Sequence, residues 1–231
     1  MCTRIVLNGQ DVINAFNFDI DLSVWNHRIF FRKDRFSIGI KMPDGRFHSF
    51  HGINANGNVG TLLYVHGNPA GSYIPGALTI AELTERFVSG ALSFDEAASL
   101  LGREKLTYAK DATMQAMLSD EKGRVLIVEP GVGFRVEKKD YSLMTNYSIL
   151  DPESTRPFLV PGDDRFERAK AQLDHLSGEA TPNFALRCLR EVSQEGIWAT
   201  RVSFVYSQNK RSGCYVLNND FEHPRRFQFV S

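Results

Sequence analysis

The stretch MCTRIVLNGQDVINAFNFDI, residues 1–20, decides the fold. Two extended runs, 3–8 and 11–20, are rich in β-branched and other apolar residues, and they are joined through the turn segment Asn8-Gly9-Gln10-Asp11. Asn-Gly between two such runs is a strong signal for a tight antiparallel hairpin. The sequence therefore predicts that two paired strands follow directly after the first two residues.

Cys2 acquires a distinctive chemistry if Met1 is removed. Cysteine is small enough for ordinary methionine removal, so we expect the mature chain to start at Cys2. An N-terminal cysteine carries a thiol with a pKa near ~8.5 and an α-amine with a pKa near ~8. Because the amine can accept the thiol proton, Cys2 is a candidate nucleophile with a built-in base. The alternative is an incidental terminal cysteine.

Composition excludes several classes of protein. The chain has 231 residues, of which 42% are hydrophobic and 23% charged, as in ordinary globular proteins. Lys+Arg and Asp+Glu both number 27, so no net charge favours nucleic acid or an anionic membrane. No signal peptide or membrane-length apolar run is found. The three cysteines are odd in number and far apart, which argues against a disulfide framework and favours the cytoplasm.

Strands and helices alternate along the chain in blocks. Thr79 with Glu82, and Ser93 with Glu96, match the capping box that begins a helix. Two further helices are predicted, at 163–176 and 182–192. Beyond the first hairpin, the predicted strands are 36–42, 47–54, 59–66, 114–119, 124–129, 134–138, 142–146, 200–207, 213–218 and 226–230. This order predicts a single α+β domain over residues 1–231, with two antiparallel sheets stacked face to face and helices on the outer faces.

Several short segments follow the N-terminal Met1-Cys2-Thr3 in a fixed order. They are Asn17-Phe18-Asp19, GINANG at 52–57, DEKG at 120–123 with the strand 125–129, Met144-Thr145-Asn146, and PGDDRF at 161–166. Together they resemble the choloylglycine hydrolase and penicillin V acylase family of N-terminal nucleophile hydrolases. The resemblance covers residues 2 to about 169, with a weaker echo in the last two strands. It implies a four-layer αββα fold that hydrolyses linear, non-peptide amides without metal or organic cofactor.

The resemblance also implies a role for five residues. Cys2 is the expected nucleophile, which forms a thioester. Asp19 is expected to orient the amine or thiol of the nucleophile, and Arg165 to supply a fixed cation beside it. Asn146 is expected to donate its side-chain amide to the oxyanion. Tyr64, matched by counting from the turn at 52–57, is expected to donate its main-chain N–H to the same oxyanion.

Each of the last four residues has an ordinary structural alternative. Asp19 would then be a surface carboxylate on a strand, and Asn146 an asparagine that caps a turn. Tyr64 would be a core or pocket-wall tyrosine, and Arg165 an arginine on a helix surface.

The sequence departs from the family pattern at two places. Phe16 stands where the family has arginine before its Asn-Leu-Asp segment, which puts the charge near Cys2 in doubt. The interval between Asn146 and Arg165 is shorter than in the family, so the family tetramer is doubtful, although a homo-oligomer stays open. The leading hypothesis is hydrolysis of a small N-acylated amide. The alternatives are acyl transfer to an amine, and a catalytically impaired member that binds a small molecule.

Overall fold

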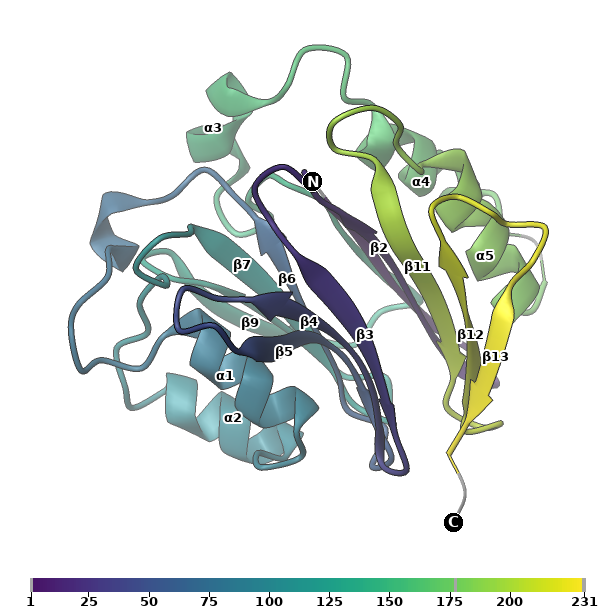
Figure 1. Cartoon of the computed structure of the whole chain (residues 1–231), viewed down its shortest axis with the longest axis horizontal. Coiled ribbons are helices and arrows are strands. Elements are labelled where there is room, and N and C mark those ends of the chain that lie inside the picture. The colour runs from purple at the N-terminus through teal and green to yellow at the C-terminus, as the bar shows by residue number, and fades with distance from the viewer. Residues whose placement is uncertain (1, 177, 230–231) are drawn as a thin grey trace. The chain divides into compact units, whose positions relative to one another are not determined.

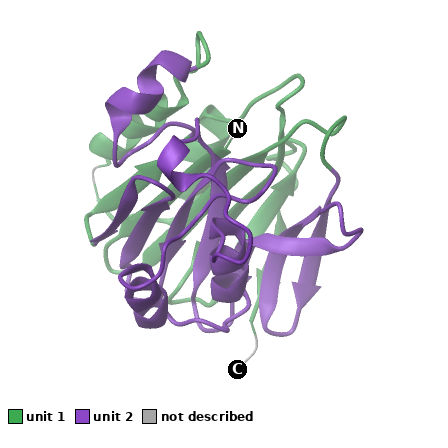
Figure 2. Ribbon diagram, turned by 90° about the vertical axis from the view of Figure 1, so that its left-hand side faces the viewer, with its two compact units in different colours: residues 1–25, 138–145, 160–231 green, residues 26–137, 146–159 purple. Residues whose placement is uncertain are grey.

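The computed structural model describes residues 2–176 and 178–229. Met1, and Val230 at the end of the last predicted strand, lie outside this part. The chain divides into two compact units with interleaved segments: unit 1 comprises residues 1–25, 138–145 and 160–231, and unit 2 comprises 26–137 and 146–159 (Figure 2). Each unit is built on one sheet. That the chain forms a single domain stays a prediction.

Unit 1 contains a six-stranded antiparallel sheet in the order β10-β1-β2-β11-β12-β13. Its strands are β1 (Cys2–Asn8), β2 (Val12–Asp19), β10 (Tyr141–Met144), β11 (Thr200–Ser207), β12 (Ser212–Leu217) and β13 (Arg225–Gln228). The predicted hairpin is confirmed, because β1 pairs with β2 along its whole length. The strand β2 is central, with β1 on one side and β11 on the other.

Helices α4 (Arg165–Asp174) and α5 (Pro182–Glu191) cover one face of this sheet (Figure 1). Side chains alternate between the two faces of a strand. Ile5, Ala15 and Val205 therefore pack together with Ala169 and Leu189 of the helices in one buried cluster. The even-numbered residues of β1, which begin with Cys2, lie on the opposite face.

Unit 2 contains a seven-stranded antiparallel sheet in which neighbours in sequence are neighbours in space. Its strands are β3 (His27–Arg32), β4 (Arg35–Lys41), β5 (Phe47–Asn54), β6 (Val59–Tyr64), β7 (Met114–Ser119), β8 (Val125–Glu129) and β9 (Gly133–Glu137). The helical segments are η1 (Pro69–Gly71), α1 (Ile80–Val88), α2 (Phe94–Leu101), α3 (Pro152–Thr155) and η2 (Arg156–Phe158). Helix α1 packs on β5, β6 and β7 (Figure 1).

Both predicted capping boxes are confirmed. At α1 the Thr79 hydroxyl accepts the main-chain N–H of Glu82 at 3.2 Å, and the Glu82 carboxylate accepts that of Thr79 at 2.9 Å. Ser93 and Glu96 make the same exchange at α2. No helix within residues 2–176 and 178–229 is long and apolar enough to cross a membrane.

Some predicted boundaries are wrong, and four elements were not predicted. The strand predicted at 59–66 ends at Tyr64, and the one at 142–146 spans 141–144. The helix predicted at 163–176 spans 165–174. β3 was missed because its side chains are half-buried or exposed on both faces, so it lacks the alternation that marks a strand. α3, η1 and η2 have only three or four residues each, too few to show a period.

Candidate active site

Cys2 is buried at the start of β1. The residue is 5% exposed, and its thiol donates to the main-chain oxygen of Asp19 with an Sγ–O distance of 3.9 Å. Burial raises the pKa of the Cys2 thiol to about 11. A thiol with a raised pKa is a poor nucleophile, because only the thiolate attacks. A neighbouring positive charge, such as the ammonium of an N-terminal cysteine, favours the thiolate.

Arg165, the first residue of α4, connects this cysteine to two carboxylates. The residue is 3% exposed, which excludes a helix-surface arginine. Its Nη1 donates to the main-chain oxygen of Cys2 at 3.0 Å and to Oδ2 of Asp19 at 3.3 Å. Its Nε and Nη2 donate to the two carboxylate oxygens of Asp163 at 2.8 and 2.7 Å. Burial alone would lower the pKa of Arg165, but the two carboxylates raise it, so its charge is fixed.

Asp19, the last residue of β2, is 1% exposed and is therefore not a surface carboxylate. Its Oδ1 accepts the Thr200 hydroxyl at 2.7 Å, and its Oδ2 accepts the side-chain amide of Gln194 at 2.7 Å. Burial raises the pKa of Asp19 above its usual range, whereas Arg165, Thr200 and Gln194 act in the opposite direction. A buried carboxylate held in this way has a defined orientation.

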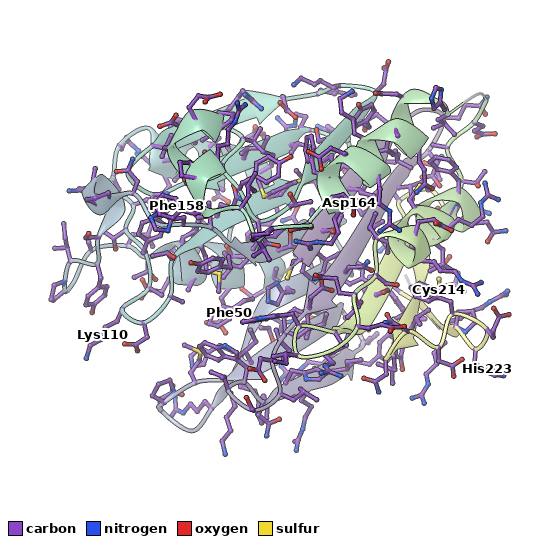
Figure 3. All side chains as sticks on the ribbon, turned by 90° about the horizontal axis from the view of Figure 1, so that it is seen from above. Phe50, Lys110, Phe158, Asp164, Cys214 and His223 are labelled. Carbon is purple, nitrogen blue, oxygen red and sulfur yellow. The ribbon has the colours of Figure 1, made fainter. Side chains whose placement is uncertain are left out.

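Three members of this cluster were missed by the sequence analysis. Asp163 lies in the PGDDRF segment two residues before Arg165, so the segment itself was the available signal. Of its two acidic residues, Asp164 lies at the start of α4 and is exposed (Figure 3), whereas Asp163 holds the guanidinium. Gln194 lies in the connection between α5 and β11, and Thr200 is the first residue of β11. No local pattern relates either of them to a residue of β2.

Tyr64 and Asn146 meet in unit 2. The Asn146 side-chain amide donates to the main-chain oxygen of Tyr64 at 2.8 Å. Tyr64 is 50% exposed at the end of β6, which excludes a core tyrosine. The structure thus brings together Cys2, Asp19 and Arg165 within unit 1, and Tyr64 with Asn146 within unit 2.

Phe16, which stands where the resemblance in the sequence leads one to expect an arginine, is fully buried on β2. Its ring lies 5.6 Å from that of Phe204 and 6.3 Å from that of Phe18, between centroids. Its partner on β1 is Arg4, which is also fully buried and donates through Nη2 to Oδ1 of Asn14 at 2.6 Å. Burial lowers the pKa of Arg4 to about 9. The guanidinium of Arg4 therefore lies at Asn14, two residues before Phe16 on β2.

A metal site is not evident in the part of the chain that the structure describes. No three His, Cys, Asp or Glu side chains within it are grouped so as to hold a metal ion. Of the two histidines three residues apart on β5, His48 is partly exposed and His51 is buried.

The chain shares its fold with solved structures of a hydrolase and an acylase, so the predicted α+β fold with two antiparallel sheets is confirmed. The chain is similar over 99% of its length to a mutant of conjugated bile acid hydrolase from Clostridium perfringens, covering 92% of that chain with a TM-score of 0.69 and 15% identity. It is similar over 94% of its length to penicillin V acylase from Agrobacterium tumefaciens, covering 83% of that chain with a TM-score of 0.65 and 19% identity.

A third similar structure is the N-acylethanolamine-hydrolyzing acid amidase ortholog from Caenorhabditis elegans. The similarity covers 90% of this chain and 93% of that one, with a TM-score of 0.59 and 15% identity. The sequence matches no family model and no curated protein. At such identities the likeness shows the fold alone.

Proposed function

We propose that this chain is a thiol amidase, which hydrolyses a linear, non-peptide amide bond of a small N-acylated substrate. The observation that carries the proposal is the buried cluster in which Arg165 contacts both Cys2 and Asp19. The fold supports it, because the similar structures are named as a hydrolase, an acylase and an amidase.

The proposed reaction begins with the removal of Met1, which gives Cys2 a free α-amine. The amine takes the thiol proton, and the sulfur attacks the carbonyl carbon of the substrate amide. The tetrahedral intermediate collapses when its carbon–nitrogen bond breaks and the leaving amine receives the proton. Water then attacks the thioester, which releases the carboxylic acid and restores the thiol.

The other site residues support this chemistry in the proposal. Asp19 orients the amine through its carboxylate, and Arg165 stabilises negative charge at the sulfur. Asn146 and the main-chain N–H of Tyr64 are the proposed oxyanion donors. A donor placed for the developing charge contributes about 3 kcal/mol to a transition state of this kind.

A second candidate function is binding without catalysis. The apolar Phe16 in place of an arginine, and the pKa of about 11 for the Cys2 thiol, both favour it. Acyl transfer is a variant of the enzyme hypothesis, in which an amine replaces water as the acceptor. Added amines would then appear in the product.

The test is intact-protein mass spectrometry after incubation with a panel of chromogenic N-acyl amides. The expected result is a protein that starts at Cys2 and gains the mass of the acyl group. The adduct should be absent in Cys2→Ala and in protein that retains Met1, and should persist in Cys214→Ala, which removes another free thiol. If no member of the panel gives turnover or an adduct on Cys2, the binding function replaces the enzyme.

A further inference from the structure

Residues 194–200, which run from the connection after α5 to the first residue of β11, form a closed loop in unit 1. Gln194 donates its main-chain N–H to the Thr200 hydroxyl at 2.9 Å, and Thr200 returns its own N–H to the main-chain oxygen of Gln194 at 3.0 Å. The side-chain amide of Asn219 donates to the same Gln194 oxygen at 2.8 Å. Loops with joined ends are compact and are frequently functional. The two end residues therefore have fixed positions.

Both end residues of this loop bind Asp19. The pairing of β11 with β2 shifts by one residue after Thr200: Thr200 pairs with Asp19, but Val202 pairs with Phe18. Arg201 is the extra residue of this β-bulge. A bulge changes the direction of a side chain relative to a regular strand. Here the bulge directly follows Thr200, whose hydroxyl donates to Oδ1 of Asp19 at 2.7 Å.

Arg165 alone compensates the charge of Asp19 only in part. Its bonds to Asp163, at 2.7 and 2.8 Å, are shorter than the 3.3 Å contact with Asp19. Two shorter contacts of Asp19 come from neutral donors, Gln194 and Thr200, with one on each carboxylate oxygen. Hydrogen bonds to an ionised group are stronger than those between neutral groups.

We propose that Gln194 and Thr200 are positioning residues that hold Asp19 as an oriented carboxylate between Arg165 and the mature Cys2. The catalytic consequence rests on the proposed function, since it is the amine of Cys2 that Asp19 would orient. The proposal assigns the loop 194–200 to the active site, although neither of its end residues contacts the substrate in the proposed reaction.

The charged and titratable groups around Asp19 set the expected direction of the effect. Cys2 faces it from β1 and Arg165 faces it from α4, with Asp163 behind Arg165. The positive charge of the amino terminus lowers the pKa of Asp19, as Arg165 does. Burial favours the neutral acid, so the loss of a donor should raise the pKa of Asp19 further. A rise of about one pH unit is expected for each donor, given the usual strength of a hydrogen bond to a charged group.

The experiment is an NMR titration of protein labelled with ¹³C at the aspartate carboxyl, in which the Asp19 signal is identified by its absence in Asp19→Asn. Thr200→Val and Gln194→Leu should each raise the Asp19 titration midpoint by about one pH unit. Thr200→Ser, which keeps the hydroxyl, should restore it. The acidic limb of the kcat/KM profile should move upward by the same amount.

Ser203→Ala is the matched control. Ser203 is a buried hydroxyl on the same strand β11, and it donates to Oδ1 of Asn17 on β2 at 2.7 Å without touching Asp19. Its removal should cost stability but leave the Asp19 midpoint unchanged. Gln194 is only partly buried, so Gln194→Leu provides the test even if Thr200→Val does not fold.

The outcomes separate the two proposals. An Asp19 midpoint that stays in place in the folded variants overturns the positioning role, whatever the activity. A midpoint that rises in a protein without amidase activity supports the role of the loop and counts against the proposed function alone.

Discussion

The Arg165 guanidinium donates to the main-chain oxygen of Cys2 at 3.0 Å and so joins the first turn of α4 to the first residue of β1, 163 positions earlier. The same guanidinium holds the carboxylate of Asp163 with two parallel bonds. The position of the candidate nucleophile therefore depends on a helix from the last third of the chain.

Removal of the Arg165 guanidinium should lower the stability of the folded protein. Arg165→Met leaves the buried Asp19 and the partly buried Asp163 without their cation, and the free energy of unfolding should fall by about 3–5 kcal/mol. Arg165→Lys keeps the charge but loses the two parallel bonds to Asp163, so it should retain only part of the stability that Arg165→Met loses. Urea unfolding provides the measurement. Arg168→Met, on the exposed side of α4, should cost less than about 1 kcal/mol; equal losses for both variants would contradict the role given to Arg165.

If the proposed function holds, Asn146 and Tyr64 should respond differently to substitution. Asn146→Ala removes a side-chain donor, and kcat should fall on the order of a hundredfold or more. Tyr64→Phe keeps the proposed main-chain donor, so kcat should stay within about threefold of the wild type. Steady-state kinetics on the best amide of the panel would measure both. A large loss in Tyr64→Phe would assign the chemistry to its hydroxyl instead.

Asn54 should prove to be a structural residue. Its side-chain amide donates to the main-chain oxygens of Phe87 and Val88 in the last turn of α1, at 3.2 and 3.3 Å. Its side-chain oxygen accepts two main-chain N–H groups of the following turn. Asn54→Ala should lower the free energy of unfolding by about 2–3 kcal/mol, because buried polar groups lose their partners. Asn56→Ala, at an exposed position of the same turn, should change it by less than about 0.5 kcal/mol in the same urea titration.

The stability of unit 2 should depend on pH through His48. Burial alone lowers the pKa of His48, but its hydrogen bonds to Asp44 and Glu85, at 2.8 and 3.1 Å, raise it above its ordinary value. A group with a raised folded-state pKa contributes stability below its unfolded pKa, here about 6.5, and this stability is lost as the pH rises through the folded value.

The difference in unfolding free energy between the wild type and His48→Gln should therefore shrink as the solution becomes alkaline. Denaturant titrations across this range would measure it. His223→Gln is the control, because its side chain is 81% exposed and its pairing with Asp220 is open to solvent. A difference that grows with pH would show that the two carboxylates do not favour the charged imidazole.

The parts of the fold that follow from local chemistry could be predicted from the sequence. The Asn8-Gly9 turn gave the first hairpin, and the pairs Thr79 with Glu82 and Ser93 with Glu96 gave two helix starts. These signals need only neighbouring residues. β3 could not be predicted, since its residues carry no apolar alternation.

The candidate site was predicted only in part. Cys2, Asp19 and Arg165 were proposed from the resemblance, and the structure brings them together in unit 1. Gln194 and Thr200 were not, because their link to Asp19 depends on a bulge and on a pairing between distant strands. A hydrogen bond of this kind has no periodic signature in a sequence. The catalytic role of these residues stays a prediction.

The central place of β2 has a consequence for how the chain is made. Thr200, which pairs with Asp19, leaves the ribosome 181 residues after Asp19 does. At typical rates of translation that interval lasts roughly ten to forty seconds. During this time β2 of the nascent chain has no β11 beside it, so the removal of Met1 that the proposed function requires can precede completion of the sheet. The α-amine of Cys2 would then be freed before the finished sheet buries the residue.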